Sequence, residues 1–410
     1  MKTLRRVVTL LLALLCLAGC GGNGTRSLTK QVNPAGAAGV EEGDASALAG
    51  FSVELLKETW NGGNALVSPL SVLSALGMTA NGARGETLEQ MEAVLGLPAE
   101  RLNAALAAWT AALPKEKDCR VDLANSIWIR DDGSFEADED FLETAAKWYQ
   151  AEAFASPFDA AAVRDINGWV DKRTHGMIPE ILSELQDSTM MVLVNALALE
   201  AEWEEIYEDI QVREDRIFTT EDGAEQPVTL MYSSEWSYMR DEHAQGFLKP
   251  YKGGRWALAA LLPDEGVRLE DYLASLTGER LHALLSGAET RKVYAAIPKF
   301  KSAYGAELND ALKALGMTDA FDMVRADLSG LGSSPLGPLF ISQVLHKTYI
   351  SVDEKGTQAG AATAVLVAAG TDGPGPDTTP VVHLDRPFLY MLVDTETNLP
   401  AFIGVVTTME

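Results

Sequence analysis

The chain has 410 residues, of which 47% are hydrophobic and 22% are charged, and its formal net charge is −26. Eight Trp, twelve Phe and ten Tyr residues exclude an intrinsically disordered chain, which would lack such large apolar side chains. The acidic excess repels phosphate groups, so we expect no nucleic-acid partner. This length allows one large domain or several smaller ones.

The first residues have the composition of an export signal. Three basic residues precede an almost wholly apolar stretch, 7–18, which is too short to span a bilayer. The stretch ends in LAGC at positions 17–20, which resembles the bacterial lipobox, a signal for lipidation of its cysteine. We expect residues 1–19 to be a lipoprotein signal peptide and Cys20 to anchor the protein outside the cytoplasmic membrane, in the bacterial cell envelope or at the cell surface. An ordinary signal peptide is the alternative.

Residues 20–44 are rich in Gly, Ala, Asn and Thr, which predicts a flexible tether before a folded domain at 45–410. With Cys16 removed and Cys20 modified, Cys119 has no disulfide partner within the chain. We therefore expect no disulfide framework and no cysteine-rich zinc site.

Apolar spacing predicts helices first and strands later. A helix start is predicted at Asp44, at Ser68-Pro69 and at Gly85. Further helices are predicted over 141–149, 166–175, 281–285 and 308–315, and strands over 121–129, 190–198, 256–262, 291–300, 344–352, 388–393 and 401–406. Strands that do not alternate with helices, and no linker between the halves, indicate a single α+β domain.

The segment 356–370 reads GTQAGAATAVLVAAG and contains neither a charge nor a proline. Composition alone leaves three interpretations open: a buried alanine-rich helix, a short membrane anchor, and a strand able to enter a sheet. In the third, residues alternate between two faces, and every N–H is free for a β-ladder. A Gly- and Pro-rich loop, 371–377, follows.

The residues around this segment resemble the serpin family, in consistent order from about 45 to 410. The matching stretches are 64–87, 166–182, 192–196 with Trp203, 298–300, 327–330, 346–359, 386–390 and 400–404. The resemblance implies the serpin fold, α+β with about nine helices and three β-sheets, and an exposed reactive-centre loop at about 356–381.

The resemblance also assigns site residues. The polar cluster called the shutter, beneath the place where the central sheet opens, would comprise Ser68, Ser71, Asn195 and His346. The breach, at the top of that sheet, would contain Trp203, Lys299 and Glu354. The hinge that must enter the sheet would be Gly356, Thr357, Gln358, Ala359, Gly360, Ala361, Ala362 and Thr363. The reactive bond would be Gly370–Thr371, with Ala369–Gly370 and Thr371–Asp372 as alternatives.

The function so implied is suicide-substrate inhibition of serine proteases, in which the cleaved loop inserts into the central sheet and traps the acyl-enzyme. No Lys or Arg lies between Lys355 and Arg386, and no Phe, Trp or Tyr between Tyr349 and Phe388, so we expect elastase-like or subtilisin-like targets. We expect a monomer without cofactor or metal, and no enzyme, because no catalytic motif is present. The alternative is a non-inhibitory serpin that acts as a protease substrate or binding protein.

Overall fold

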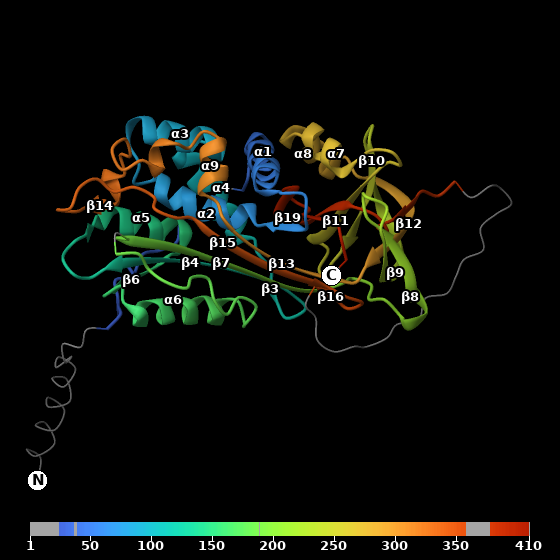
Figure 1. Cartoon of the computed structure of the whole chain (residues 1–410), viewed down its shortest axis with the longest axis horizontal. Coiled ribbons are helices and arrows are strands. Elements are labelled where there is room, and N and C mark those ends of the chain that lie inside the picture. Colours follow the sequence, from blue (N-terminus) through green and yellow to red (C-terminus); the bar gives the residue numbers. More distant parts are fainter. Residues whose placement is uncertain (1–23, 37–38, 188, 358–377, 410) are drawn as a thin grey trace, which may run out of the picture.

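The computed structural model describes residues 24–36, 39–187, 189–357 and 378–409. Within these ranges it contains nine α-helices and three β-sheets (Figure 1). The helices are α1 (Glu42–Thr59), α2 (Pro69–Ala80), α3 (Gly85–Leu95), α4 (Ala99–Ala111), α5 (Glu139–Tyr149), α6 (Ala160–Arg173), α7 (Leu269–Ser275), α8 (Gly278–Ser286) and α9 (Asn309–Ala314).

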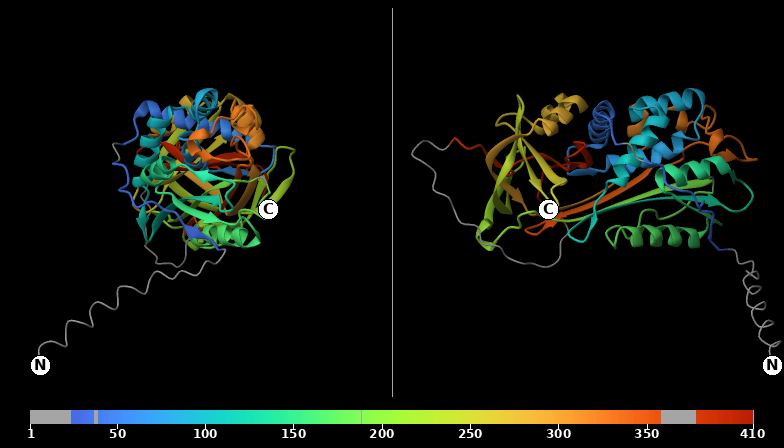
Figure 2. Two further views of the ribbon diagram at one scale, coloured as in Figure 1. Left: turned by 90° about the vertical axis from the view of Figure 1, so that its left-hand side faces the viewer. Right: turned by 180° about the vertical axis from the view of Figure 1, so that it is seen from behind.

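The central sheet has eight strands and runs along the long axis of the molecule (Figures 1 and 2). Its order is β1 (Arg26–Ser27), β6 (Glu152–Ser156), β4 (Cys119–Arg130), β7 (Met191–Glu202), β16 (Gly356–Thr357), β15 (Leu345–Val352) and β13 (Phe300–Glu307), with β3 (Lys115–Glu116) beside β4.

The second sheet has nine strands and lies toward one end of the long axis, on the right in Figure 1. Its order is β17 (Val381–His383), β12 (Glu289–Pro298), β9 (Glu225–Arg240), β10 (Ala244–Pro250), β11 (Trp256–Pro263), β18 (Phe388–Asp394), β19 (Leu399–Val406) and β2 (Ala65–Val67), with β8 (Val212–Thr219) beside β9. A third, two-stranded sheet pairs β5 (Glu136–Ala137) with β14 (Gly332–Ser333).

Strand β7 is buried on both faces, as its apolar run predicts. Leu197 and Leu199 face the main core, which α1 and α2 also line. Val194 and Ala196 face the other way and pack beneath α6 in a separate apolar cluster. Any strand added beside β7 would therefore have one face in the core and the other under α6.

Local signals explain the helix starts near the central sheet. The Ser68 hydroxyl accepts from the N–H of Ser71, and Pro69 occupies the first turn of α2, as predicted. Helix α6 begins earlier than predicted, because the Asp159 carboxylate accepts from the N–H groups of Ala161 and Ala162.

The segment 291–300, predicted as one strand, is divided between two sheets. Strand β12 ends at Pro298, and β13 begins at Phe300 and pairs with β15. The intervening Lys299 donates its N–H to the carbonyl of Thr229. Composition gave no sign of this division because the residues on both sides have strand propensity.

Part of the segment predicted as a flexible tether, 20–44, is paired with the central sheet in the structure. Arg26 and Ser27 pair with Ala155 and Phe154 at the edge of β6, and the N–H of Leu28 donates to the carbonyl of Ala153 at 2.7 Å. Arg26 also binds both carboxylate oxygens of Asp131, at 3.0 and 3.1 Å. The unpaired edge of β6 supplies backbone partners that the composition of the tether cannot reveal.

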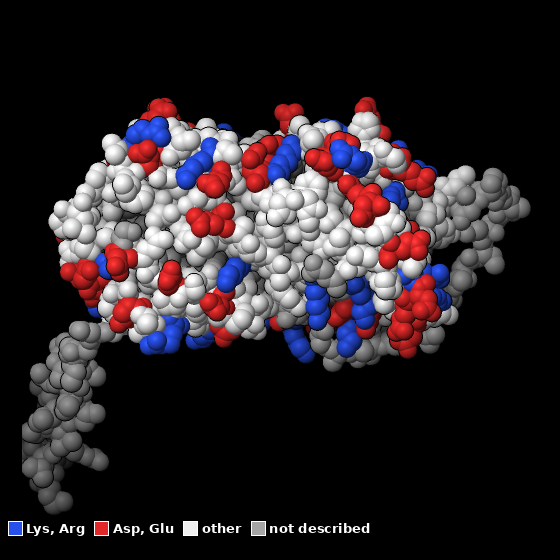
Figure 3. All heavy atoms as spheres, in the orientation of Figure 1, with Lys and Arg blue, Asp and Glu red and all other residues white. Residues whose placement is uncertain are grey.

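Acidic and basic side chains are interspersed on the face shown in Figure 3, and neither sign forms a continuous surface there. No helix among the described residues is long and apolar enough to cross a membrane.

Candidate functional site

The central sheet is open between β7 and β15. Strand β16 lies between them at one end only, where Thr357 pairs with Ala201 on β7 and with Val352 on β15. Below this short wedge, β7 and β15 share no ladder within the described ranges. Both strands run antiparallel to β16, so they are parallel to each other and could accept a strand between them. We call the space between these two edges the slot.

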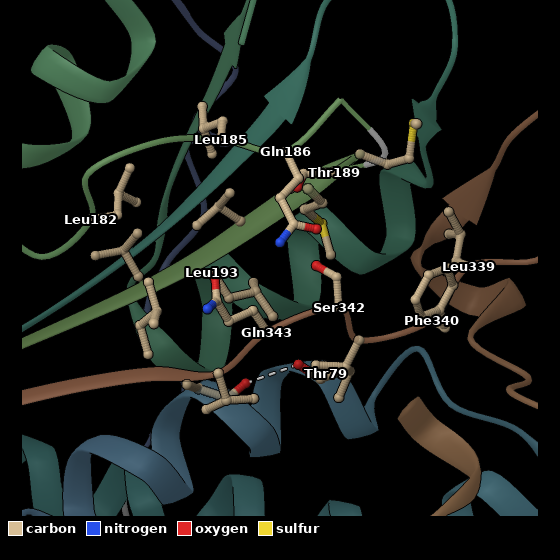
Figure 4. Close-up of a pocket in the computed structure, with 18 of the residues that line it drawn as sticks. Thr79, Leu182, Leu185, Gln186, Thr189, Leu193, Leu339, Phe340, Ser342 and Gln343 are labelled. Carbon is tan, nitrogen blue, oxygen red and sulfur yellow. Dashed lines mark hydrogen bonds between the residues drawn. The ribbon is translucent and has the colours of Figure 1, made fainter. Parts of the chain in front are cut away.

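A cavity of about 360 Å³ occupies the lower part of the slot. Residues of β7, of the loop before it and of the segment that leads into β15 line this cavity. In Figure 4, Gln186, Thr189, Leu193 and Ser342 converge on it from these elements. The cavity therefore lies where a strand between β7 and β15 would run.

A polar network crosses beneath the slot through the start of α2. The N–H of Ser68 donates to Nε2 of His346 on β15 at 3.0 Å, and the Ser68 hydroxyl donates to the carbonyl of Ala401 at 2.9 Å. On the other side, the Ser71 hydroxyl donates to Oδ1 of Asn195 on β7. The structure thus brings the four shutter residues together, with Asn195 and His346 on opposite sides of the slot.

Asn125 belongs to the same network but was not singled out from the sequence. Its Oδ1 accepts from Nδ2 of Asn195 at 2.6 Å, and its own Nδ2 donates to the carbonyl of Tyr149 at 2.8 Å. An available signal was that Asn125 is a polar residue at an inward position of an alternating strand, because a buried amide needs hydrogen-bond partners.

His346 is neutral at physiological pH. Burial lowers the pKa of its imidazole to about 4. Because Nε2 accepts the N–H of Ser68, the ring proton sits on Nδ1. Protonation would place two N–H groups against each other and break the link between α2 and β15.

The breach holds the turn between β15 and β16. Nε1 of Trp203 donates to the carbonyl of Asp353 at 2.9 Å, and the indole ring stacks on Tyr251 with centroids 4.5 Å apart. Nζ of Lys299 lies 2.7 Å from Oε2 of Glu354. The hydrogen bond from Lys299 is the main cause that lowers the pKa of Glu354. Both partners are more than a third exposed, so this pair contributes little to stability.

The described part of the hinge is already seated in the sheet. A Cβ on Gly356 would clash with the carbonyl oxygen of Ala201, so the position requires glycine. Thr357 is buried, and its hydroxyl lies 2.6 Å from the hydroxyl of Tyr251. Tyr251 was not predicted as a site residue, because nothing near it in the sequence marks it. The hinge residues 358–363 and the reactive-bond candidates Ala369, Gly370, Thr371 and Asp372 lie outside the described residues.

Comparison with known proteins identifies this arrangement. Residues 46–409 match the family described as Serpin (serine protease inhibitor). The chain belongs to the serpin family. It is 31% identical to human Serpin B9, with 86% of this chain and 96% of the relative covered, and 31% identical to an uncharacterized serpin-like protein from Thermococcus kodakarensis, with 89% and 86% covered.

The serpin fold predicted from sequence is also confirmed by solved structures. The thermophilic serpin tengpin in its native state superposes with a TM-score of 0.88 at 43% identity, covering 94% of this chain and all of that chain. The latent state of tengpin gives a TM-score of 0.80 at 41% identity, covering 90% and 99%.

Among the residues that the structure describes, no group of three or more His, Cys, Asp and Glu side chains is arranged to hold a metal ion. Cys119 is buried, and burial raises the pKa of its thiol to about 11, so it is a poor nucleophile.

Proposed function

We propose that this serpin is a suicide-substrate inhibitor of serine proteases. The serine of a protease attacks the carbonyl of the reactive bond, and the amine of the following residue leaves. The N-terminal side of the loop stays bound to the protease as an ester, fills the slot and carries the protease with it. Within the described ranges no strand residue lies between β7 and β15 beyond Thr357, and this open stretch of the sheet supports the proposal most directly. Turnover of typical enzymes is ~1–10³ s⁻¹, so insertion must be comparably fast to precede hydrolysis of the acyl-enzyme.

The register at Thr357 defines the path of insertion. Continuing the antiparallel pairing would place Ala359 between Leu199 and Ile350, and Thr363 between Asn195 and His346. The hydroxyl of Thr363 would then reach the two shutter residues that the slot separates. Val367 would lie opposite Met191, at the far end of β7.

The two faces of the inserted strand would meet different surroundings. Because Thr357 faces the core, the other odd-numbered residues through Val367 would also do so. Gly360, Ala362 and Ala364 would pass beneath α6, where Val194 and Ala196 already pack against that helix. Small side chains on this face would let the strand enter without displacing α6 far.

We further propose elastase-like or subtilisin-like targets, with cleavage at Gly370–Thr371 or at one of the two neighbouring bonds. The small residues before these bonds suit the narrow primary pockets of such proteases. The absence of Lys, Arg and large aromatic residues across the loop disfavours trypsin-like and chymotrypsin-like enzymes.

We also propose that the chain is anchored to the cell envelope through lipidated Cys20. Three residues lie between Cys20 and Gly24, so these two residues are at most about 14 Å apart along an extended chain. Arg26 lies in one row of the sheet with Ala155, Ile129 and Met191, because each is the register partner of the next. The chain thus enters the domain at the end of the slot that Val367 would reach, opposite the end at which β16 lies (Figure 1).

Two experiments test these proposals. Incubation with an elastase and with a subtilisin should yield covalent complexes that survive SDS, and sequencing of the released C-terminal fragment gives the cleaved bond. Cleavage without a complex would instead favour the non-inhibitory alternative. Intact-mass analysis of native protein should show diacylglyceryl-modified Cys20 as the first residue. An unmodified Cys20 would contradict the proposed lipid anchor.

A further inference from the structure

An ion pair is buried beneath the breach. Lys249 on β10 and Glu235 on β9 are only 2% and 5% exposed, and Nζ of Lys249 lies 2.9 Å from Oε1 of Glu235. The Ser233 hydroxyl donates to the same carboxylate oxygen at 2.5 Å. Buried ion pairs are often no more stabilising than apolar residues of similar volume, because both charges lose their hydration. Stability alone therefore does not account for this pair.

The ammonium group of Lys249 lies against two aromatic rings. Nζ is 4.4 Å from the ring centroid of Tyr207 and 5.3 Å from that of Trp203. Cation–π attraction is strongest where the cation is desolvated, as it is here. Glu235 fixes the position of the cation, and the cation in turn fixes the two rings.

Both ring-bearing residues hold the turn that leads into the hinge. The N–H of Tyr207 donates to the carbonyl of Glu354 at 2.9 Å, and Nε1 of Trp203 donates to the carbonyl of Asp353 at 2.9 Å. Trp203 also stacks almost parallel to Tyr251, with 9° between the planes, and Tyr251 contacts the hydroxyl of Thr357. A continuous set of contacts therefore runs from the ion pair to the first seated residue of the hinge.

We propose that the Glu235–Lys249 pair positions the hinge: through Trp203 and Tyr207 it holds residues 353–357 at the entrance of the slot, so that insertion starts from a preformed first step. This inference rests on the proposed insertion mechanism. Glu235 and Lys249 are positioning residues, because they act on residues 353–357 through Trp203 and Tyr207.

The first test needs no protease. The double variant E235Q/K249M removes both charges while keeping similar volume and an acceptor for Ser233. Hydrogen–deuterium exchange of uncut protein should become about tenfold faster over residues 353–357, equal to about 1.4 kcal/mol of lost protection. The variant R240M/D264N removes a more exposed ion pair, between Arg240 on β9 and Asp264 just after β11, and is the matched control, in which exchange in this turn should be unchanged.

The second test measures the partition of the acyl-enzyme between trapping and hydrolysis. In E235Q/K249M the moles of substrate cleaved per mole of protease trapped should rise several-fold, with association rate and melting temperature of the uncut protein unchanged. A structural role alone would lower the melting temperature and leave the partition unchanged. If the double variant does not fold, Tyr207→Leu keeps the pair, removes one ring and should accelerate exchange in the same turn.

Unchanged exchange over 353–357 in a folded E235Q/K249M protein would overturn the positioning role. An equal acceleration of exchange over 353–357 in the control variant R240M/D264N would also overturn this role. If the unaltered protein traps no protease, the proposed function fails, and the exchange experiment still decides whether the pair holds the turn.

Discussion

The N–H of Ser68 donates a 3.0 Å hydrogen bond to Nε2 of His346. This bond joins the start of α2 to β15, one of the two strands that border the slot. This contact requires a neutral imidazole. It makes the stability of the uncut protein sensitive to acid.

The first prediction concerns that sensitivity. The pKa of His346 is about 4 in the folded protein and about 6.5 when unfolded, so below 6.5 the unfolded chain binds the proton first. His346 should thus reduce the free energy of unfolding progressively from pH 6.5 to 4, by about 3 kcal/mol in total. In His346→Gln an amide oxygen can still accept from Ser68 but does not titrate. Urea unfolding across this range should show a flatter pH dependence in the variant; parallel curves would contradict the assignment.

The second prediction concerns the register of insertion. In protein cleaved within the loop, Thr363→Val should reduce stability by about 1–2 kcal/mol, because Asn195 and His346 would face a buried methyl group. The uncut variant should unfold like the unaltered protein and is the internal control. An equal loss in both forms, or no loss in the cleaved form, would show that Thr363 does not reach this site. Melting curves of the cleaved and uncut proteins provide the comparison.

The third prediction concerns the attachment of β1. The Leu28 amide should exchange with deuterium at least about tenfold more slowly than in an unstructured peptide, because it donates to Ala153 within a paired edge. Arg26→Ala should accelerate this exchange by removing the bidentate contact with Asp131. Exchange of the Leu28 amide at the free-peptide rate would instead support the flexible tether predicted from composition.

The fourth prediction concerns specificity. Gly370→Arg should convert the serpin into an inhibitor that forms SDS-stable complexes with trypsin, because an arginine then precedes the proposed reactive bond. Complex formation with elastase should decline in parallel. A variant that trypsin cleaves after position 370 without a covalent complex would show that the reactive bond is misassigned.

Much of the fold was predictable because its signals are local. Ser68-Pro69 marks the start of α2, and the apolar run at 190–198 marks a strand buried on both faces. The slot was not predictable in the same way, because it depends on how β7 and β15 are placed, roughly 150 residues apart. The family resemblance, rather than any pattern, assigned His346 and Asn195 to one cluster.

Other features were hidden because their environment is tertiary. Glu235 and Lys249 have the composition of a solvated strand surface, and only the packing of β9 against β10 buries them. The tether residues became a strand because β6 has a free edge. Tyr251 contacts the hinge only because its hydroxyl lies beside that of Thr357, which is more than 100 residues later in the chain.

The most direct test of the insertion mechanism is the stoichiometry of SDS-stable complex formation by Ala359→Pro. Proline lacks the N–H needed for the ladder and clashes in a central strand, so insertion should stop soon after Thr357. In the proposed mechanism the protease binds and cleaves the loop before insertion begins, so association and cleavage should be unchanged. Ala359→Ser, which keeps the N–H, is the matched control and should trap normally.

We predict that Ala359→Pro is cleaved at the normal rate, yields little covalent complex and shows no rise in melting temperature after cleavage, whereas the unaltered protein and Ala359→Ser melt far higher once cut. Stoichiometric SDS-stable complexes from Ala359→Pro would contradict the insertion mechanism for this chain.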